Sequence, residues 1–165
     1  MSVQGEEKKR NKVLVLGVGN LFCGDDGIGA ILAERLSAKL KHIDRLEVIN
    51  GGTAGLGLLY LLEEYADVII LDSVEAGRKP GEVLSFRGEE LERGMLGETL
   101  SSHQPGVTEL LRLAKLSGKL PPNVLILAVQ VKEITSSYGL SEELKSKLPE
   151  IEKRIEEAIL SYLDA

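Results

Sequence analysis

The chain has 165 residues, of which 43% are hydrophobic and 28% are charged, as is ordinary for one globular domain with a sizeable core. Its 20 basic and 26 acidic residues give a net charge of −6, which argues against non-specific binding to nucleic acid. No stretch approaches the roughly 20 apolar residues that span a bilayer. Cys23 is the only cysteine, so a disulfide within the chain and a cysteine metal cluster are excluded.

The first eleven residues differ in composition from the rest. Residues 1–11 are polar and charged and lack an apolar core, so they predict neither a signal peptide nor a membrane anchor. We expect a disordered tail at 1–11 and a single domain over 12–165. We also expect the protein to lie in the cytoplasm, with no membrane and no nucleic acid among its partners.

The stretch at residues 12–30, KVLVLGVGNLFCGDDGIGA, predicts a strand, a tight loop and a helix. The apolar run at 13–16 suits a strand that is buried on both faces of a parallel sheet. The loop leaves at the carboxyl end of this strand, where open α/β folds place their ligands. Gly17 and Gly19 resemble the start of a dinucleotide-binding fingerprint, but its third glycine would fall on Phe22, so the motif fails.

Apolar strands and amphipathic helices alternate along the chain. Apolar residues at helical spacing predict a helix over 25–40, and apolar runs predict strands at 46–49, 68–71 and 124–129. The segment at 82–86 alternates more and predicts an antiparallel edge strand. This order calls for right-handed crossovers. The sequence therefore predicts a single-domain, three-layer α/β sandwich, with a mostly parallel twisted sheet of about five strands, helices on both faces and one antiparallel edge strand.

Turn and capping residues predict where the remaining helices begin and end. Thr53 can cap a helix after the second strand. Residues 87–102 predict a long surface loop with one helical turn, and the helix after this loop can end at Gly118. The tail over 141–162 is predicted to be helical, with Pro149 at the first position of its longer second part.

Three polar positions are candidates for chemistry. Asp25 and Asp26 begin the first predicted helix, where one carboxylate can cap the helix while its neighbour projects into the crevice. Asp72 directly follows the third strand, and a turn or cap is its ordinary role. If the first and third strands are adjacent, Asp26 and Asp72 meet at the same carboxyl edge of the sheet. His103 enters from the end of the long loop, although a lone loop histidine is more often a surface residue.

Two carboxylates and one imidazole at a strand edge are compatible with two kinds of chemistry. They suit a divalent metal of borderline hardness, with positions left open for substrate ligands. They also suit general acid and base roles in the attack of water on an amide. Spacing does not choose between these roles. Neither a Gly-x-Ser-x-Gly elbow nor a His-Glu-x-x-His helix is present, so serine-hydrolase and zincin chemistry lack support.

Several blocks of the sequence resemble those of the nickel-iron hydrogenase maturation endopeptidases, in the order of that family and over nearly the whole chain. These proteases trim the C-terminal extension from the hydrogenase large subunit after nickel has been inserted. The matching blocks are LVLGVGN at 14–20, DDGIG at 25–29, NGGTAG at 50–55, Asp72, SHQ at 102–104 and GLS at 139–141.

The resemblance implies a function, a partner and a set of site residues. It implies that Asp26, Asp72 and His103 contact the metal and carry the catalysis. The nickel would be carried by the large-subunit precursor, so we expect no tightly bound cofactor in the enzyme itself. The remaining site residues are predicted to hold the substrate in the same crevice. They are Gly19, Asn20, Asp25, Gly51, Gly52 and Thr53.

Two other functions stay open on the sequence alone. A non-proteolytic nickel carrier or assembly scaffold on the same fold would bind the precursor without shortening it. A nucleotide-binding oxidoreductase would bind NAD or a flavin, and the missing third glycine counts against it. The presence of both acids and the histidine favours the protease.

Overall fold

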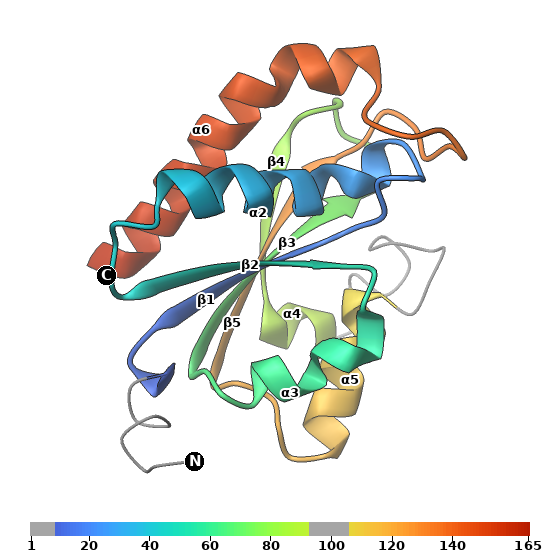
Figure 1. Cartoon of the computed structure of the whole chain (residues 1–165). Coiled ribbons are helices and arrows are strands. Elements are labelled where there is room, and N and C mark those ends of the chain that lie inside the picture. The colour runs from blue at the N-terminus through green and yellow to red at the C-terminus, as the bar shows by residue number, and fades with distance from the viewer. Residues whose placement is uncertain (1–8, 93–105) are drawn as a thin grey trace.

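The computed structural model describes residues 9–92 and 106–165, whose strands form one mixed sheet (Figure 1). The strands are β1 (Val13–Val18), β2 (Leu46–Gly52), β3 (Asp67–Val74), β4 (Val83–Arg87) and β5 (Asn123–Gln130). Their order across the sheet is β2-β1-β3-β5-β4. The pairing of β4 with β5 is antiparallel and the other pairings are parallel. The predicted fold class is therefore confirmed.

Helices cover both faces of this sheet, as Figure 1 shows. One layer contains α2 (Ile28–Lys39), which follows the short 3₁₀ helix η1 (Asp25–Gly27), and the long α6 (Glu142–Asp164). The opposite layer contains the 3₁₀ helix η2 (Gly55–Leu58), α3 (Leu59–Leu62) and α5 (Val107–Leu116). The short α4 (Gly88–Glu92) follows the edge strand β4.

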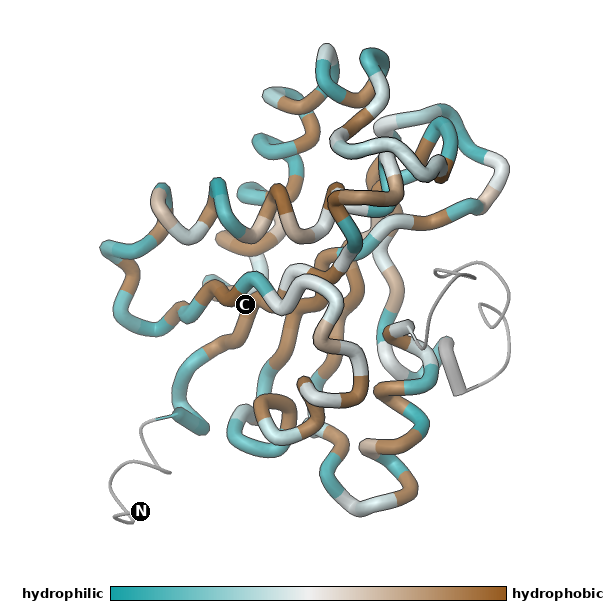
Figure 2. Tube along the Cα trace, turned by 45° about the vertical axis from the view of Figure 1, so that its right-hand side comes forward, coloured by the Kyte–Doolittle hydropathy of each residue, from teal (hydrophilic) through white to brown (hydrophobic). Residues whose placement is uncertain are grey.

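The two layers of helices meet different side chains of the same strands. In β1, Leu14 and Leu16 pack with the layer of α3 and α5, whereas Val13 and Val15 pack with the layer of α2 and α6. This alternation follows from the pleat, which points successive side chains to opposite faces. Figure 2 shows the resulting hydrophobic colour along the strands. Burial on both faces explains the unbroken apolar runs of the strands.

Two predicted helix ends are wrong and one is confirmed. Thr53 does not cap the next helix, because the chain first makes η2, whose N-cap is Ala54. Pro149 does not start a second part of the last helix, since α6 is continuous and Pro149 lies inside it on an exposed position. Water can satisfy the carbonyl group that loses its intrahelical partner there. Gly118 follows the end of α5 with a positive φ, as predicted.

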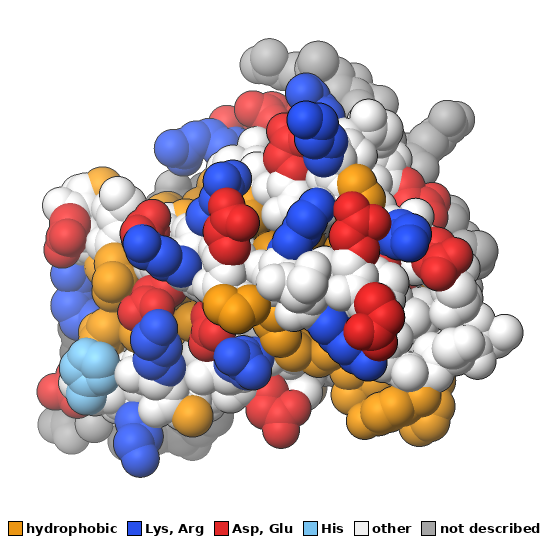
Figure 3. Space-filling model, turned by 90° about the horizontal axis from the view of Figure 1, so that it is seen from above, with side chains coloured by type: hydrophobic (Ala, Val, Ile, Leu, Met, Phe, Trp, Pro, Cys, Tyr) orange, Lys and Arg blue, Asp and Glu red, His pale blue; other side chains and the backbone are white. Residues whose placement is uncertain are grey.

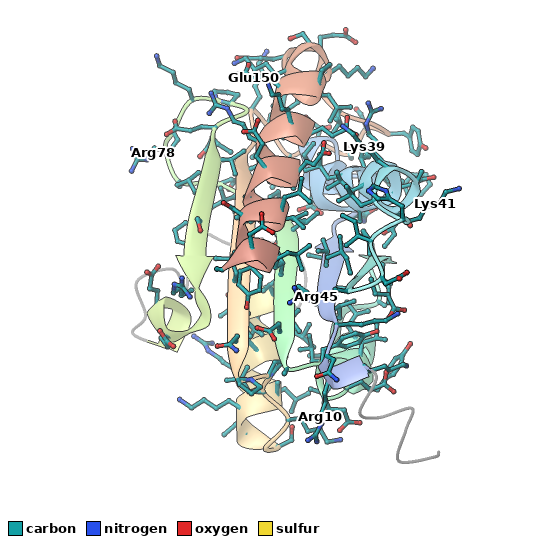
Figure 4. All side chains as sticks on the ribbon, turned by 90° about the vertical axis from the view of Figure 1, so that its left-hand side faces the viewer. Arg10, Lys39, Lys41, Arg45, Arg78 and Glu150 are labelled. Atoms are coloured by element: carbon teal, nitrogen blue, oxygen red, sulfur yellow. The ribbon has the colours of Figure 1, made fainter. Side chains whose placement is uncertain are left out.

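Ion pairs connect the outer surfaces of α2 and α6. Lys39 of α2 lies 2.6 Å from Glu156 of α6, and Figure 4 shows Lys39 beside the long helix, with Arg10 at the other end of the molecule. Such exposed pairs contribute about 0–1 kcal/mol each, so the helices are held mainly by their buried apolar faces. No helix in the described part of the chain is both long enough and apolar enough to cross a membrane.

Candidate functional site

A small cleft opens at the carboxyl end of the sheet, between β1 and β3. The chain leaves β1 toward β2 on one side, while β3 and β5 lie on the other side. Ligands bind at such switch points in open α/β sheets, because the connections diverge there. Pairing of β1 with β3 ends at Gly17 and Leu71, but β3 continues beside β5 to Val74. Asp72 therefore lies within β3 beyond the last residue paired with β1, and not after the strand end as predicted.

The cleft is lined by both polar and apolar residues. Its polar lining contains Asp26 and Asp72, and its apolar lining comes mainly from Leu58, Val107 and Leu110. Four of the predicted substrate-binding residues also line it, namely Gly19, Asn20, Gly52 and Thr53. The described residues leave a volume of about 50 Å³ there. A water molecule takes about 30 Å³ in the liquid, so this space fits an ion or a short piece of backbone.

Ser73 connects the two acids of the cleft. Its backbone N–H donates to Oδ1 of Asp72 over 2.8 Å, and its hydroxyl donates to Oδ1 of Asp26 over 3.0 Å. The other oxygen of Asp26 accepts the backbone N–H of Asn20 over 3.0 Å. Sequence reasoning missed Ser73, and its position directly after Asp72 was the available signal. Asp26 of η1, Asp72 and Ser73 of β3, and the Asn20 N–H from the loop after β1 thus form one hydrogen-bonded unit.

The carboxyl group of Asp72 is only partly satisfied. Asp72 is 2% exposed, and no described residue forms a hydrogen bond with its Oδ2. Burial raises the pKa of Asp72 to about 8, and the nearby charge of Asp26 adds to the rise, whereas the Ser73 N–H opposes it. A buried carboxyl with a strongly raised pKa in a cleft is typical of functional sites.

Glycines let the loops after β1 and β2 approach each other at the cleft. The Gly19 N–H donates to the Gly52 carbonyl over 3.0 Å. Gly19 has a φ of 148°, and a Cβ atom there would lie 2.2 Å from the carbonyl oxygen of Asp26. The glycines of this loop therefore serve close backbone packing, which a side chain would prevent.

Asp25 does not lie in the cleft where it was predicted to hold the substrate. Its carboxylate is fully buried and accepts hydrogen bonds from the backbone N–H groups of Lys132, Glu133 and Ser141, and from the Ser141 hydroxyl. It does not line the cleft. Asp25 thus fastens the segment between β5 and α6 to the start of η1.

Two further predicted site residues are not among the described residues that line the cleft. His103 is outside the described residues, although Gly106, three residues later, lines the cleft. Gly51 does not line it, because the side chains of Leu16 and Leu58 pack closely against Gly51. A Cβ atom at this position would lie 3.0 Å from both of them. Within residues 9–92 and 106–165, no three potential metal ligands of the Asp, Glu, His and Cys types come together.

Comparison with known proteins identifies the family. A family model described as hydrogenase maturation protease matches residues 31–158. The chain belongs to this hydrogenase maturation protease family. The hydrogenase expression/formation protein HoxM of Azotobacter vinelandii is 33% identical over 137 residues, which cover 82% of this chain and 66% of HoxM. The hydrogenase 2 maturation protease of Escherichia coli is 30% identical over 155 residues, which cover 93% of this chain and 90% of that protein.

Solved structures of the hydrogenase maturation protease family share this fold. The hydrogenase maturating endopeptidase HybD of Escherichia coli has a TM-score of 0.73 and 26% identity, over 92% of this chain and 93% of HybD. The [NiFe] hydrogenase maturation protease HybD of Thermococcus kodakarensis has a TM-score of 0.70 and 28% identity, over 89% and 98% of the two chains. By contrast, this chain spans only about two thirds of the length of HoxM, at 66%.

Proposed function

We propose that this protein is an endopeptidase that removes the C-terminal extension of a nickel-iron hydrogenase large-subunit precursor after nickel insertion. The single observation that carries this proposal is the meeting of Asp26 and Asp72 in one cleft at the switch point of a hydrogenase maturation protease fold. The names of the relatives agree with a proteolytic role, since they describe maturation proteases and endopeptidases.

We further propose that nickel carried by the precursor is the recognition anchor, held by Asp26, Asp72 and His103. The two carboxylates supply oxygen ligands, and the Asp72 Oδ2 is the buried acceptor that has no described partner. A histidine and two acids leave coordination positions open for ligands from the precursor. Binding of the ion would release the proton of Asp72, which its burial otherwise favours.

Cleavage of the peptide bond requires one water molecule and a group that acts first as general base and then as general acid. A carboxylate in the cleft can accept the proton as the water attacks the scissile carbonyl, and can return it to the leaving amine. Asp72 can take this role only in its ionised form, which burial disfavours and which binding of the precursor's nickel would favour. Polarisation of the water by the precursor's nickel is the second route. Both routes need the scissile bond aligned beside the acids, which the anchor provides.

The test is mass spectrometry of a hydrogenase large-subunit precursor after incubation with this protein, with nickel-loaded and nickel-free precursor side by side. We expect the loaded form alone to lose a C-terminal peptide. Cleavage of both forms would keep the protease and remove the nickel anchor. Binding of the precursor without cleavage of either form would overturn the proposal in favour of a carrier or scaffold.

Variants of the proposed ligands connect that activity to the cleft. Asp26→Asn and His103→Ala should abolish processing of the loaded precursor. Asp26→Asn should leave the fold unchanged, because Asp26 is only partly buried and the amide keeps the size of the side chain. Asp44→Asn is the matched control, since Asp44 is exposed and does not line the cleft. Normal processing by the Asp26 and His103 variants would contradict the assigned ligands.

A further inference from the structure

Two exposed aromatic side chains stand together beside the cleft. Phe22 is 68% exposed and Tyr138 is 71% exposed, and their ring centroids lie 5.3 Å apart in an edge-to-face arrangement. Phe22 belongs to the loop after β1, and Tyr138 to the segment between β5 and α6. Figure 3 shows hydrophobic side chains protruding at the lower right of the face it draws, the side on which these two loops lie. We call Phe22 and Tyr138 the aromatic pair.

Backbone hydrogen bonds hold the two loops of the aromatic pair together. The Gly24 N–H donates to the Ser137 carbonyl, and the Gly139 N–H donates to the Leu21 carbonyl, each over 2.8 Å. The buried carboxylate of Asp25 connects the same two segments through its hydrogen bonds with the backbone N–H groups of Lys132 and Ser141. These hydrogen bonds order the two loops before a partner binds. The conformational-entropy cost of ordering them on binding is therefore small.

The aromatic pair is continuous with the cleft. Asn20 lines the cleft, and its side-chain oxygen accepts the Phe22 N–H over 2.9 Å. The backbone N–H of the same residue donates to Asp26. The loop that carries Phe22 thus also supplies a residue to the cleft, which favours contact between the aromatic pair and a protein chain bound at Asp26 and Asp72.

We propose that the aromatic pair is a docking site for the folded body of the hydrogenase large-subunit precursor. This inference rests on the proposed function and adds a second recognition element outside the cleft. The occupant should present an apolar depression that receives both rings, because clustered aromatic side chains dominate the affinity of many interfaces. The cleft would then hold the segment that is cut, while the aromatic pair holds the globular part of the same substrate.

Steady-state processing of the nickel-loaded precursor tests this docking site. In the double variant Phe22→Ala with Tyr138→Ala, we expect KM for the precursor to rise about tenfold and kcat at saturating precursor to stay within about twofold. The double variant Phe22→Tyr with Tyr138→Phe keeps both rings and should restore the KM. Tyr60→Ala with Leu116→Ala is the matched control, since these side chains are 61% and 85% exposed and do not line the cleft.

The outcomes separate this inference from the proposed function. If the wild-type protein cleaves the loaded precursor and the double alanine variant has the same KM, the docking site is wrong and the protease stands. If the wild-type protein cleaves no precursor, the proposed function itself fails. Sedimentation velocity tests the alternative that a second copy of the chain binds the aromatic pair. In that case the wild type would be a dimer, the double alanine variant would be a monomer, and the KM would be unchanged. The unfolding midpoints of all variants should agree, because the substituted side chains are exposed.

Discussion

A carboxyl group that is buried with one unsatisfied oxygen is expensive for the fold, and Asp72 is such a group. The Ser73 N–H compensates only one of its oxygens. Such a loss of folding stability is common at binding and catalytic sites, where the residues that give activity often destabilise the fold. At the scale of the residue, we therefore expect Asp72 to reduce the stability of the protein.

The Asp72→Asn substitution should change how stability depends on pH. The folded-state pKa of about 8 lies above the ordinary value of 3.8, so the folded protein holds a proton that the unfolded chain has lost over this range. The wild-type free energy of unfolding, relative to that of Asp72→Asn, should therefore fall as pH rises from about 4 to about 8, by up to about 1.4 kcal/mol per pH unit. Urea unfolding at several pH values measures this difference.

The matched control for this titration is Glu157→Gln, which replaces an exposed carboxylate on α6. It should leave the pH dependence of the free energy of unfolding close to that of the wild type. A constant stability difference between wild type and Asp72→Asn across the range would contradict the raised pKa of Asp72.

The packing of α2 against the strand ends depends on glycine. A Cβ on Gly17 would lie 2.3 Å from the carbonyl oxygen of Gly29 and 2.4 Å from the Ala33 side chain. A Cβ on Gly29 would lie 2.3 Å from the carbonyl oxygens of both Val18 and Leu71. At the scale of the element, these glycines therefore let α2 begin close above β1 and β3, and this places Asp26 of η1 beside Ser73.

We expect Gly17→Val to destabilise the fold by about 3 kcal/mol or more, because backbone atoms of α2 would have to move. Gly57→Ala is the control, since its new Cβ would meet only the Ala54 side chain, at 4.0 Å. That variant should stay within about 0.5 kcal/mol of the wild type. Thermal unfolding of both variants makes the comparison, and equal midpoints would refute the close packing at Gly17.

At the scale of the whole molecule, two hydrophobic clusters share a single sheet. Leu62 belongs to the cluster under α3 and α5, and Leu36 to the cluster under α2 and α6, and both side chains are fully buried. Strands β1, β3 and β5 contribute side chains to both clusters. Loss of either helical layer would expose the sheet that supports the other one.

Leu62→Ala and Leu36→Ala should each reduce the stability of the entire fold by about 2–5 kcal/mol. Urea unfolding followed by far-UV circular dichroism and by tyrosine fluorescence should give one coincident transition for each variant. Two separate transitions in either variant would mean that the layers unfold independently.

The fold and half of the site follow from local patterns that the sequence displays directly. Runs buried on both faces give apolar strands, so β1 and β3 were predicted with few errors, and Asp26 and Asp72 meet in the cleft at the carboxyl edge of the sheet as expected. Errors arose where tertiary contacts override local signals. Thr53 is a favoured capping type but η2 forms first, and Pro149 is tolerated inside α6 because its position faces water.

Only the tertiary structure decided how the neighbouring residues divide their roles. Local pattern alone does not tell Asp25 from Asp26, because both are acids at a helix start, and only the family resemblance singled out Asp26. Asp25 becomes structural since the segment before α6 brings backbone donors to it, whereas Asp26 faces Ser73. The meeting of Phe22 and Tyr138 likewise depends on two loops far apart in the chain. The sequence by itself determined which elements form, because burial fixes the spacing of apolar residues in each strand and helix. Packing between distant segments determined which side chains face the cleft.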